Sequence, residues 1–86
     1  MPRLSYFYGI VVSMYSSDHP PPHFHARYGE YEAKIDIGTG EPQAGEVPVR
    51  ALRLIREWAE LHRAELLADW ELAQARKELA KIDPLP

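Results

Sequence analysis

Three histidines lie close together around a run of prolines, in the segment Asp18-His19-Pro20-Pro21-Pro22-His23-Phe24-His25. Imidazole and carboxylate groups are ligands that zinc, nickel and copper prefer. Imidazole also titrates near neutral pH, which suits general acid–base catalysis. The segment is therefore the main candidate for chemistry in this chain, either as a metal centre or as an acid–base centre.

His23 and His25 are two residues apart in a stretch that reads as a β-strand. Side chains at positions i and i+2 of a strand point to the same face. Arg27 continues this face, while Phe24, Ala26 and Tyr28 alternate with it and suit a core. If the site is catalytic, we expect a histidine to act as acid or base and Arg27 to stabilise the charge of a phosphate.

The position of His19 depends on the proline run. The run is stiff, so the loop loses little conformational entropy when it becomes ordered. The run can fold His19 and its neighbour Asp18 back toward the other two histidines. At about 3.1 Å per residue it can equally hold His19 some 9–12 Å away. No distant Glu or Cys stands out as a fourth metal ligand, so a structural role, or a contact with a partner, is the alternative for all three histidines.

Strand patterns occur in four segments of the first part of the chain: residues 4–16, 23–28, 31–37 and 42–47. The first is rich in β-branched and aromatic residues and predicts one long central strand, bent at Gly9. The second and third flank Gly29-Glu30 and predict a β-hairpin. The fourth follows a glycine turn and predicts a short edge strand.

The second half of the chain has a helical pattern. Pro48 suits the first turn of a helix, and residues 49–63 place apolar and charged residues on opposite halves of a helical wheel. The pattern shifts near residues 62–65, which predicts a bend or break and a second helix over residues 64–76. Residues 83–86 contain two prolines and form a tail. Strands followed by helices predict an α+β fold, a small antiparallel sheet of three to four strands packed against two C-terminal helices.

Both predicted helices carry candidates for contacts with a partner. Trp58 and Trp70 lie on the apolar stripes, where they anchor either the core or a protein interface. Arg53 and Arg56 lie on a basic edge that is either a solvated face or a contact with RNA or an acidic partner. His62 lies on the apolar face, where it is either buried with one hydrogen bond or joins the histidine site.

Composition limits the classes of protein that fit. A chain of 86 residues makes a single domain, residues 1–86, with a small core. The chain has no cysteine, which excludes disulfide scaffolds and zinc ribbons. A net charge of −3 leaves nucleic-acid binding to a local cluster rather than to the whole surface. No signal-peptide pattern follows Met1, and no apolar stretch is long enough to span a membrane, so we expect a cytoplasmic protein.

Several motifs together resemble one bacterial family, the domain-of-unknown-function 4160 family. The motifs are Tyr6-Phe7-Tyr8-Gly9-Ile10 with Met14-Tyr15, Asp18-His19, Pro21-Pro22-His23-Phe24-His25, Tyr28-Gly29-Glu30-Tyr31, Arg50-Ala51-Leu52, Glu57-Trp58-Ala59-Glu60-Leu61-His62 and Leu66-Leu67 with Asp69-Trp70-Glu71. The similarity covers nearly the whole chain. Pro20 stands where members of the family often carry another residue.

The resemblance implies no established activity. Genes of the family often lie beside genes of the domain-of-unknown-function 2442 family, in an arrangement like type II toxin–antitoxin pairs. This implies a small cytoplasmic protein that binds an antitoxin-like protein partner, and we expect that function here. The alternatives are a metal-binding module and an RNA-directed enzyme, with a divalent transition metal as the cofactor that the histidines would hold. Whether the protein is an enzyme, and in which oligomeric state it acts, stay open.

Overall fold

A tight turn divides the N-terminal segment into two strands. In the computed structural model, which describes residues 2–86, β1 spans Arg3–Phe7 and β2 spans Ile10–Ser13. Tyr8 and Gly9 join them with φ angles of +49° and +80°. Positive φ at both central residues is the geometry of the hairpin turn whose twist matches antiparallel strands. The prediction of one long strand over residues 4–16 is therefore wrong.

The sheet has five antiparallel strands in the order β1-β2-β3-β4-β5, rather than three to four. The remaining strands are β3 (His23–Tyr28), β4 (Tyr31–Asp36) and β5 (Pro42–Glu46). The predicted hairpin and the predicted edge strand are confirmed, as is the α+β class. The extra strand comes from the turn at Tyr8-Gly9, which also makes β1 an edge strand instead of a central one.

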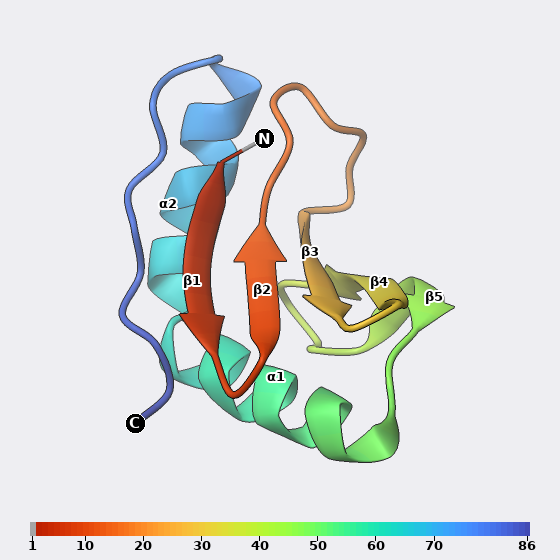
Figure 1. Cartoon of the computed structure of the whole chain (residues 1–86). Coiled ribbons are helices and arrows are strands. Elements are labelled where there is room, and N and C mark those ends of the chain that lie inside the picture. The colour runs from red at the N-terminus through yellow and green to blue at the C-terminus, as the bar shows by residue number, and fades with distance from the viewer. Residues whose placement is uncertain (1) are drawn as a thin grey trace.

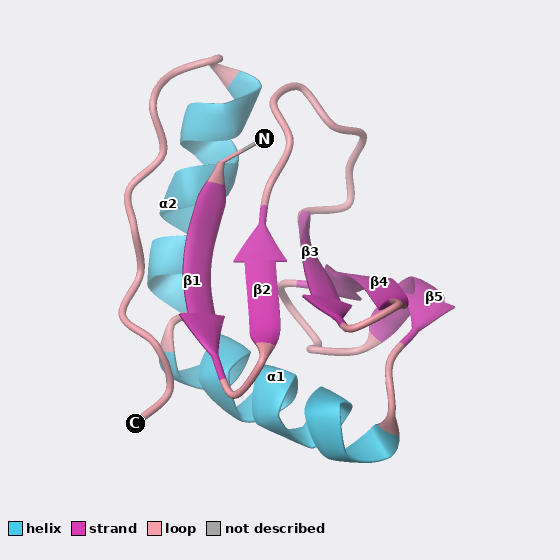
Figure 2. Cartoon of the chain, in the orientation of Figure 1, coloured by secondary structure: helices cyan, strands magenta, loops and turns pink. Residues whose placement is uncertain are grey.

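Two helices follow the sheet, α1 (Val49–Leu61) and α2 (Arg63–Gln74), and the predicted break falls at His62. Viewed as in Figure 1, α2 runs behind β1, and α1 crosses below the turn that joins β1 and β2. Along the chain every strand precedes both helices among the described residues. Figure 2 distinguishes the strands, in magenta, from the helices, in cyan. Within residues 2–86, neither helix has the length and apolar character that crossing a membrane requires.

The core is built around Trp58, which is fully buried. Its ring lies 5.2 Å from that of Phe7 and 5.7 Å from that of Phe24, measured between centroids. Trp70 is also buried, at 5% exposure. Both indoles therefore pack the interior, one of the two roles that the sequence left open, and neither lies on the surface. Two leucines of the helices, Leu61 and Leu67, are exposed.

The chain beyond α2 returns as an extended segment along β1, drawn in dark blue in Figure 1. The backbone N–H of Ile82 donates to the carbonyl of Leu4 at 2.9 Å, and the Trp58 indole N–H donates to the carbonyl of Asp83 at 2.8 Å. Ile82 and Leu85 are buried. The C-terminal segment thus covers the edge of β1, where unpaired backbone groups would otherwise be open to another strand. The sequence predicted only that residues 83–86 are not helical.

Asp69 is a buried carboxyl group between α2 and the C-terminal segment, with 1% of its surface exposed. Its Oδ1 accepts a hydrogen bond from the backbone N–H of Ala80 at 2.9 Å, while Oδ2 has no partner among the described residues. Burial raises the pKa of Asp69 above its usual value; the Ala80 hydrogen bond opposes this shift, and the nearby charge of Glu65 adds to it. The folded protein therefore holds this proton more tightly than the unfolded chain does.

We predict that Asp69→Asn stabilises the protein at pH 7 by about 1 kcal/mol, because it keeps the Oδ1 acceptor and removes a buried charge. Between the ordinary value of 3.8 and the raised pKa, the folded state binds more protons than the unfolded state. Asp69 therefore lowers the free energy of unfolding as pH rises through that range. Urea unfolding from pH 3 to pH 8 should show the advantage of Asp69→Asn growing with pH. Glu71→Gln, on the exposed side of α2, is the control and should shift neither stability nor its pH dependence; an advantage that is constant with pH would contradict the prediction.

Candidate functional site

The loop between β2 and β3 is fastened to the C-terminal end of α2. The backbone N–H of Ser17 donates to the carbonyl of Ala73 at 3.1 Å, and the Gln74 side-chain amide donates to the carbonyl of Asp18 at 2.9 Å. Arg76 donates to the Ser17 hydroxyl at 2.9 Å. The last carbonyls of a helix have no partner within the helix, so they are available to a loop in this way. These contacts fix the position of Asp18.

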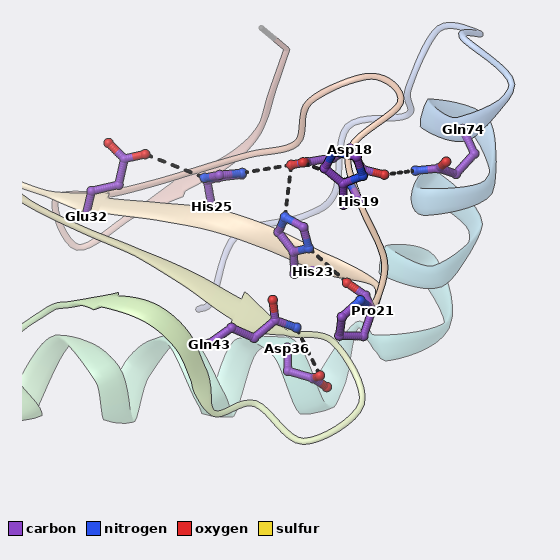
Figure 3. A network of polar contacts seen from close by, with 9 residues as sticks. All are labelled: Asp18, His19, Pro21, His23, His25, Glu32, Asp36, Gln43 and Gln74. Carbon is purple, nitrogen blue, oxygen red and sulfur yellow. Dashed lines mark hydrogen bonds and ion pairs between the residues drawn. The ribbon is translucent and has the colours of Figure 1, made fainter.

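One carboxylate oxygen of Asp18 faces both histidines of β3. Asp18 Oδ2 lies 2.9 Å from His23 Nε2 and 3.2 Å from His25 Nε2. The other oxygen, Oδ1, accepts a hydrogen bond from the backbone N–H of His19 at 2.9 Å. Figure 3 shows the two rings converging on the carboxylate from neighbouring positions of the strand. His23 and His25 lie on one face of β3 as predicted, since Phe24 and Ala26 between and beyond them are in the core.

His23 lies between two oxygens that accept hydrogen bonds. Its Nδ1 is 2.9 Å from the carbonyl of Pro21, so Nδ1 must carry the hydrogen that it donates. Its Nε2 is 2.9 Å from Asp18, and an ionised carboxylate also only accepts. A neutral imidazole has one hydrogen and cannot satisfy both oxygens. Matching both oxygens would take a second hydrogen on Nε2 or a cation held between Nε2 and the carboxylate.

His25 has the same orientation. Its Nε2 points to Asp18, and its Nδ1 lies 3.6 Å from a carboxylate oxygen of Glu32 on β4. Tyr15 packs edge-on against its ring, with centroids 4.3 Å apart, and Trp70 packs against His23 at 5.3 Å. Both histidines are buried: His25 is 9% exposed and His23 is 2% exposed. The surrounding aromatic rings therefore hold each imidazole in one orientation.

The Asp18 carboxylate is charged at neutral pH. Burial on its own would raise the pKa of Asp18, but the hydrogen bonds from His25, from the backbone N–H of His19 and from His23 outweigh it. The charge on His23 adds to their effect, and the pKa of Asp18 is held below its usual value. The site therefore combines an anionic oxygen with two imidazole nitrogens.

Among residues 2–86, the one group of three side chains that could together hold a metal ion is Asp18, His23 and His25. Their ligand atoms all lie within 4.8 Å of one another. Zinc binds nitrogen and oxygen ligands at about 2.0–2.2 Å, which places neighbouring ligand atoms roughly 3.3–3.6 Å apart in tetrahedral geometry. The two nitrogen–oxygen distances here, 2.9 and 3.2 Å, are shorter than that spacing and are those of hydrogen bonds. To hold a zinc ion, the carboxylate and the two imidazoles would have to move apart.

The predicted site residues do not all gather at this cluster. The imidazole of His19 is exposed and lies outside the group; Asp18 occupies the place that a third histidine was expected to take. Arg27 is exposed and lines a pocket together with His25. His62 is placed elsewhere: its Nδ1 pairs with Glu65 and its ring packs on Trp58. The predicted partner residues Arg53 and Arg56 are both exposed, and Arg56 pairs with Glu41 at 3.3 Å.

The sequence analysis missed Glu32 and the carbonyl of Pro21. Glu32 could have been found, because the confirmed hairpin pairs His25 with Lys34, two residues beyond Glu32. Residues two apart on a strand share a face, so Glu32 had to lie diagonally across from His25. The Pro21 carbonyl had no signal of its own in the sequence.

We predict that Asp18→Ala lowers the free energy of unfolding by about 1–3 kcal/mol, because it leaves Nε2 of two buried imidazoles without their acceptor. His19→Ala, at the adjacent exposed position, is the control and should change stability by less than about 0.5 kcal/mol. Urea unfolding at pH 7 with a chelator present measures both variants. Equal stability of Asp18→Ala and the parent chain would mean that the carboxylate does not support the two histidines.

No curated protein and no solved structure matches this chain. A family model described as "Domain of unknown function (DUF4160)" matches residues 9–71. That range covers most of the chain and includes Asp18, both buried histidines and the aromatic residues around them. The chain therefore belongs to the family of the domain of unknown function DUF4160.

Proposed function

We propose that Asp18, His23 and His25 bind a divalent transition-metal ion, with zinc as the first choice. The observation that carries the proposal is the position of His23 between the carbonyl of Pro21 and the carboxylate of Asp18. With Nδ1 donating to Pro21, the lone pair of Nε2 points to where Asp18 and His25 also direct their ligand atoms. A metal ion at that point would satisfy all three groups.

The surroundings of both imidazoles favour metal binding. Histidines that bind a metal through one nitrogen usually donate the other N–H to a carbonyl or a carboxylate, which fixes the tautomer and the ring. His23 has the carbonyl of Pro21 in this position, and His25 has the carboxylate of Glu32 at 3.6 Å. A histidine acting as a free acid or base must reach its substrate, whereas the surface of His23 is only 2% exposed.

Three protein ligands leave one or more coordination positions for water or substrate. This ligand count is typical of catalytic zinc sites, whereas structural sites use four protein ligands. Zinc in such a site lowers the pKa of a bound water to near neutrality, which supports hydrolysis. The chain itself would contribute the charge of Asp18 and the fixed orientation of the two rings.

The test is zinc binding to protein purified without a histidine tag. We expect a stoichiometry near one zinc per chain and a melting temperature that rises with zinc, by an amount equivalent to about 2.7 kcal/mol at 100 times the Kd. His23→Ala and His25→Ala should each weaken binding at least about tenfold, since each removes a ligand.

His19→Ala is the matched control, because it removes an imidazole from the same segment but from outside the ligand group. It should bind zinc within about twofold of the parent chain, a difference of roughly 0.4 kcal/mol. A stoichiometry near zero in the parent chain, or equal losses in His19→Ala and His23→Ala, would rule out the proposed centre.

We propose, as a second function, that the protein pairs in the cytoplasm with an acidic protein partner, in the manner of a toxin–antitoxin module. The observation that favours it is a pocket of about 480 Å³ where the tips of two hairpins meet α1, lined by Tyr8, Tyr28, Pro48, Arg50, Ala51 and Leu54. Tyr8 and Tyr28 are 59% and 39% exposed. Tyrosine and arginine are the residue types that dominate binding energy at protein interfaces. Arg50, with Arg53 further along α1, favours an acidic partner.

The test is co-expression with the protein encoded beside it, followed by purification of one and detection of the other. We expect stable co-purification, and Tyr28→Ser should abolish it by removing a ring from the pocket. Tyr31→Ser is the control, because Tyr31 is 46% exposed and pairs with Tyr28 across the hairpin but does not line the pocket. Loss of binding in both variants, or in neither, would contradict this interface.

A further inference from the structure

A second pocket lies on the open face of the sheet, directly beside His25. It has a volume of about 170 Å³ and is lined by Arg3, Val11, Ser13, His25, Arg27 and Glu32, from four adjacent strands. Strand pairing explains the grouping: Arg3 pairs with Ser13 and Ser13 with His25, while Val11 pairs with Arg27 and Arg27 with Glu32. A water molecule occupies about 30 Å³ of liquid, so the pocket has room for roughly five or six waters or one small polyatomic group.

Two of the residues that line the pocket are arginines, and no carboxylate among residues 2–86 forms an ion pair with either of them. Arg27 forms no side-chain hydrogen bond or ion pair with any residue in the described range 2–86. The guanidinium of Arg3 lies over the ring of Tyr6, 5.4 Å from its centroid, and has no carboxylate partner within that range. The single acidic residue of the pocket, Glu32, faces His25. The pocket therefore has an excess of positive charge in a protein whose net charge is −3.

We infer that this pocket binds the phosphate group of a phosphate monoester. Guanidinium groups bind oxyanions through pairs of parallel hydrogen bonds. A carboxylate has two oxygens, and a single guanidinium can occupy both. A phosphate has further oxygens and a larger charge, so it can accept from Arg3 and Arg27 together while the Ser13 hydroxyl lies at the same wall. The small volume fits one phosphate group rather than a nucleic-acid strand, which also agrees with the net charge of −3.

His25 belongs to both sites. Its Nε2 faces Asp18, and its ring forms part of the wall of the phosphate pocket. A phosphate held by the two arginines would thus lie next to the proposed metal centre, which makes a phosphate ester the substrate class of that centre. This assignment of substrate rests on the proposed metal function, whereas the binding of phosphate by the arginines does not.

The experiment is a titration of the metal-free protein with inorganic phosphate, followed by backbone amide NMR shifts at constant ionic strength. We expect saturable shifts at residues of the pocket and a Kd that Arg27→Gln weakens at least about tenfold, because a charged hydrogen-bond pair is lost. Arg3→Gln should have a similar effect from the opposite strand of the pocket. Lys77→Gln is the control: it removes the same unit of charge from an exposed position beyond α2 and should leave the Kd within about twofold.

Shifts that do not saturate, or an equal loss in Lys77→Gln, would overturn the inference, since either result indicates general attraction between charges. Acetate titrated in parallel separates phosphate from carboxylate, and acetate binding as tight as phosphate binding would overturn the choice of phosphate. Zinc binding to the same samples tests the metal centre separately. Saturable phosphate binding without zinc binding would support the phosphate pocket and contradict the metal centre. Zinc binding without phosphate binding would support the metal centre and contradict the phosphate pocket.

Discussion

The site depends on a single carboxylate oxygen that two imidazoles share. Asp18 Oδ2 is within hydrogen-bond distance of Nε2 of both His23 and His25, on a strand where these side chains are almost completely buried. Burying an imidazole without a partner for its nitrogens is costly, so the strand can hold two of them only while Asp18 stays in place. The fold must therefore keep a loop residue at a fixed point above β3.

The C-terminal end of α2 meets that requirement. Backbone and side-chain contacts from Ala73, Gln74 and Arg76 hold the loop at Ser17 and Asp18, and Trp70 one turn earlier packs against His23. α2 is in turn held by the core contacts of Leu66 and Ala73. The polar site and the apolar core are thus joined through one helix. This explains how a chain with a small core can keep a buried, charged cluster in a defined arrangement.

Sequence patterns predicted the parts of the structure that local rules determine. The two-residue period of β3 placed His23 and His25 on one face, and the shift in helical period located the break at His62. Local rules did not reveal the turn at Tyr8-Gly9, because an aromatic residue with positive φ hides a hairpin among strand-forming residues. Nor could they decide between His19 and Asp18, since the path of the loop depends on Gln74, which is 56 residues away from Asp18. The C-terminal segment was missed for the same reason: its place along β1 is set by long-range contacts such as that of Ile82 with Leu4.

The two proposed ligands, a metal ion and a phosphate group, would both bind beside His25 and would therefore affect each other's binding. A cation bound at Nε2 of His25 and an anion bound against the same ring would lie close together in a partly buried region, where attraction between opposite charges is stronger than in water. Each ligand would then favour the binding of the other, and by thermodynamic linkage the two effects must be equal in free energy. Glu32 opposes this coupling, because its carboxylate faces Nδ1 of His25 and repels an anion in the pocket that it lines. The same carboxylate supports the imidazole as a metal ligand, so Glu32 strengthens metal binding and weakens phosphate binding. The balance between these two effects sets how strongly the two sites are coupled.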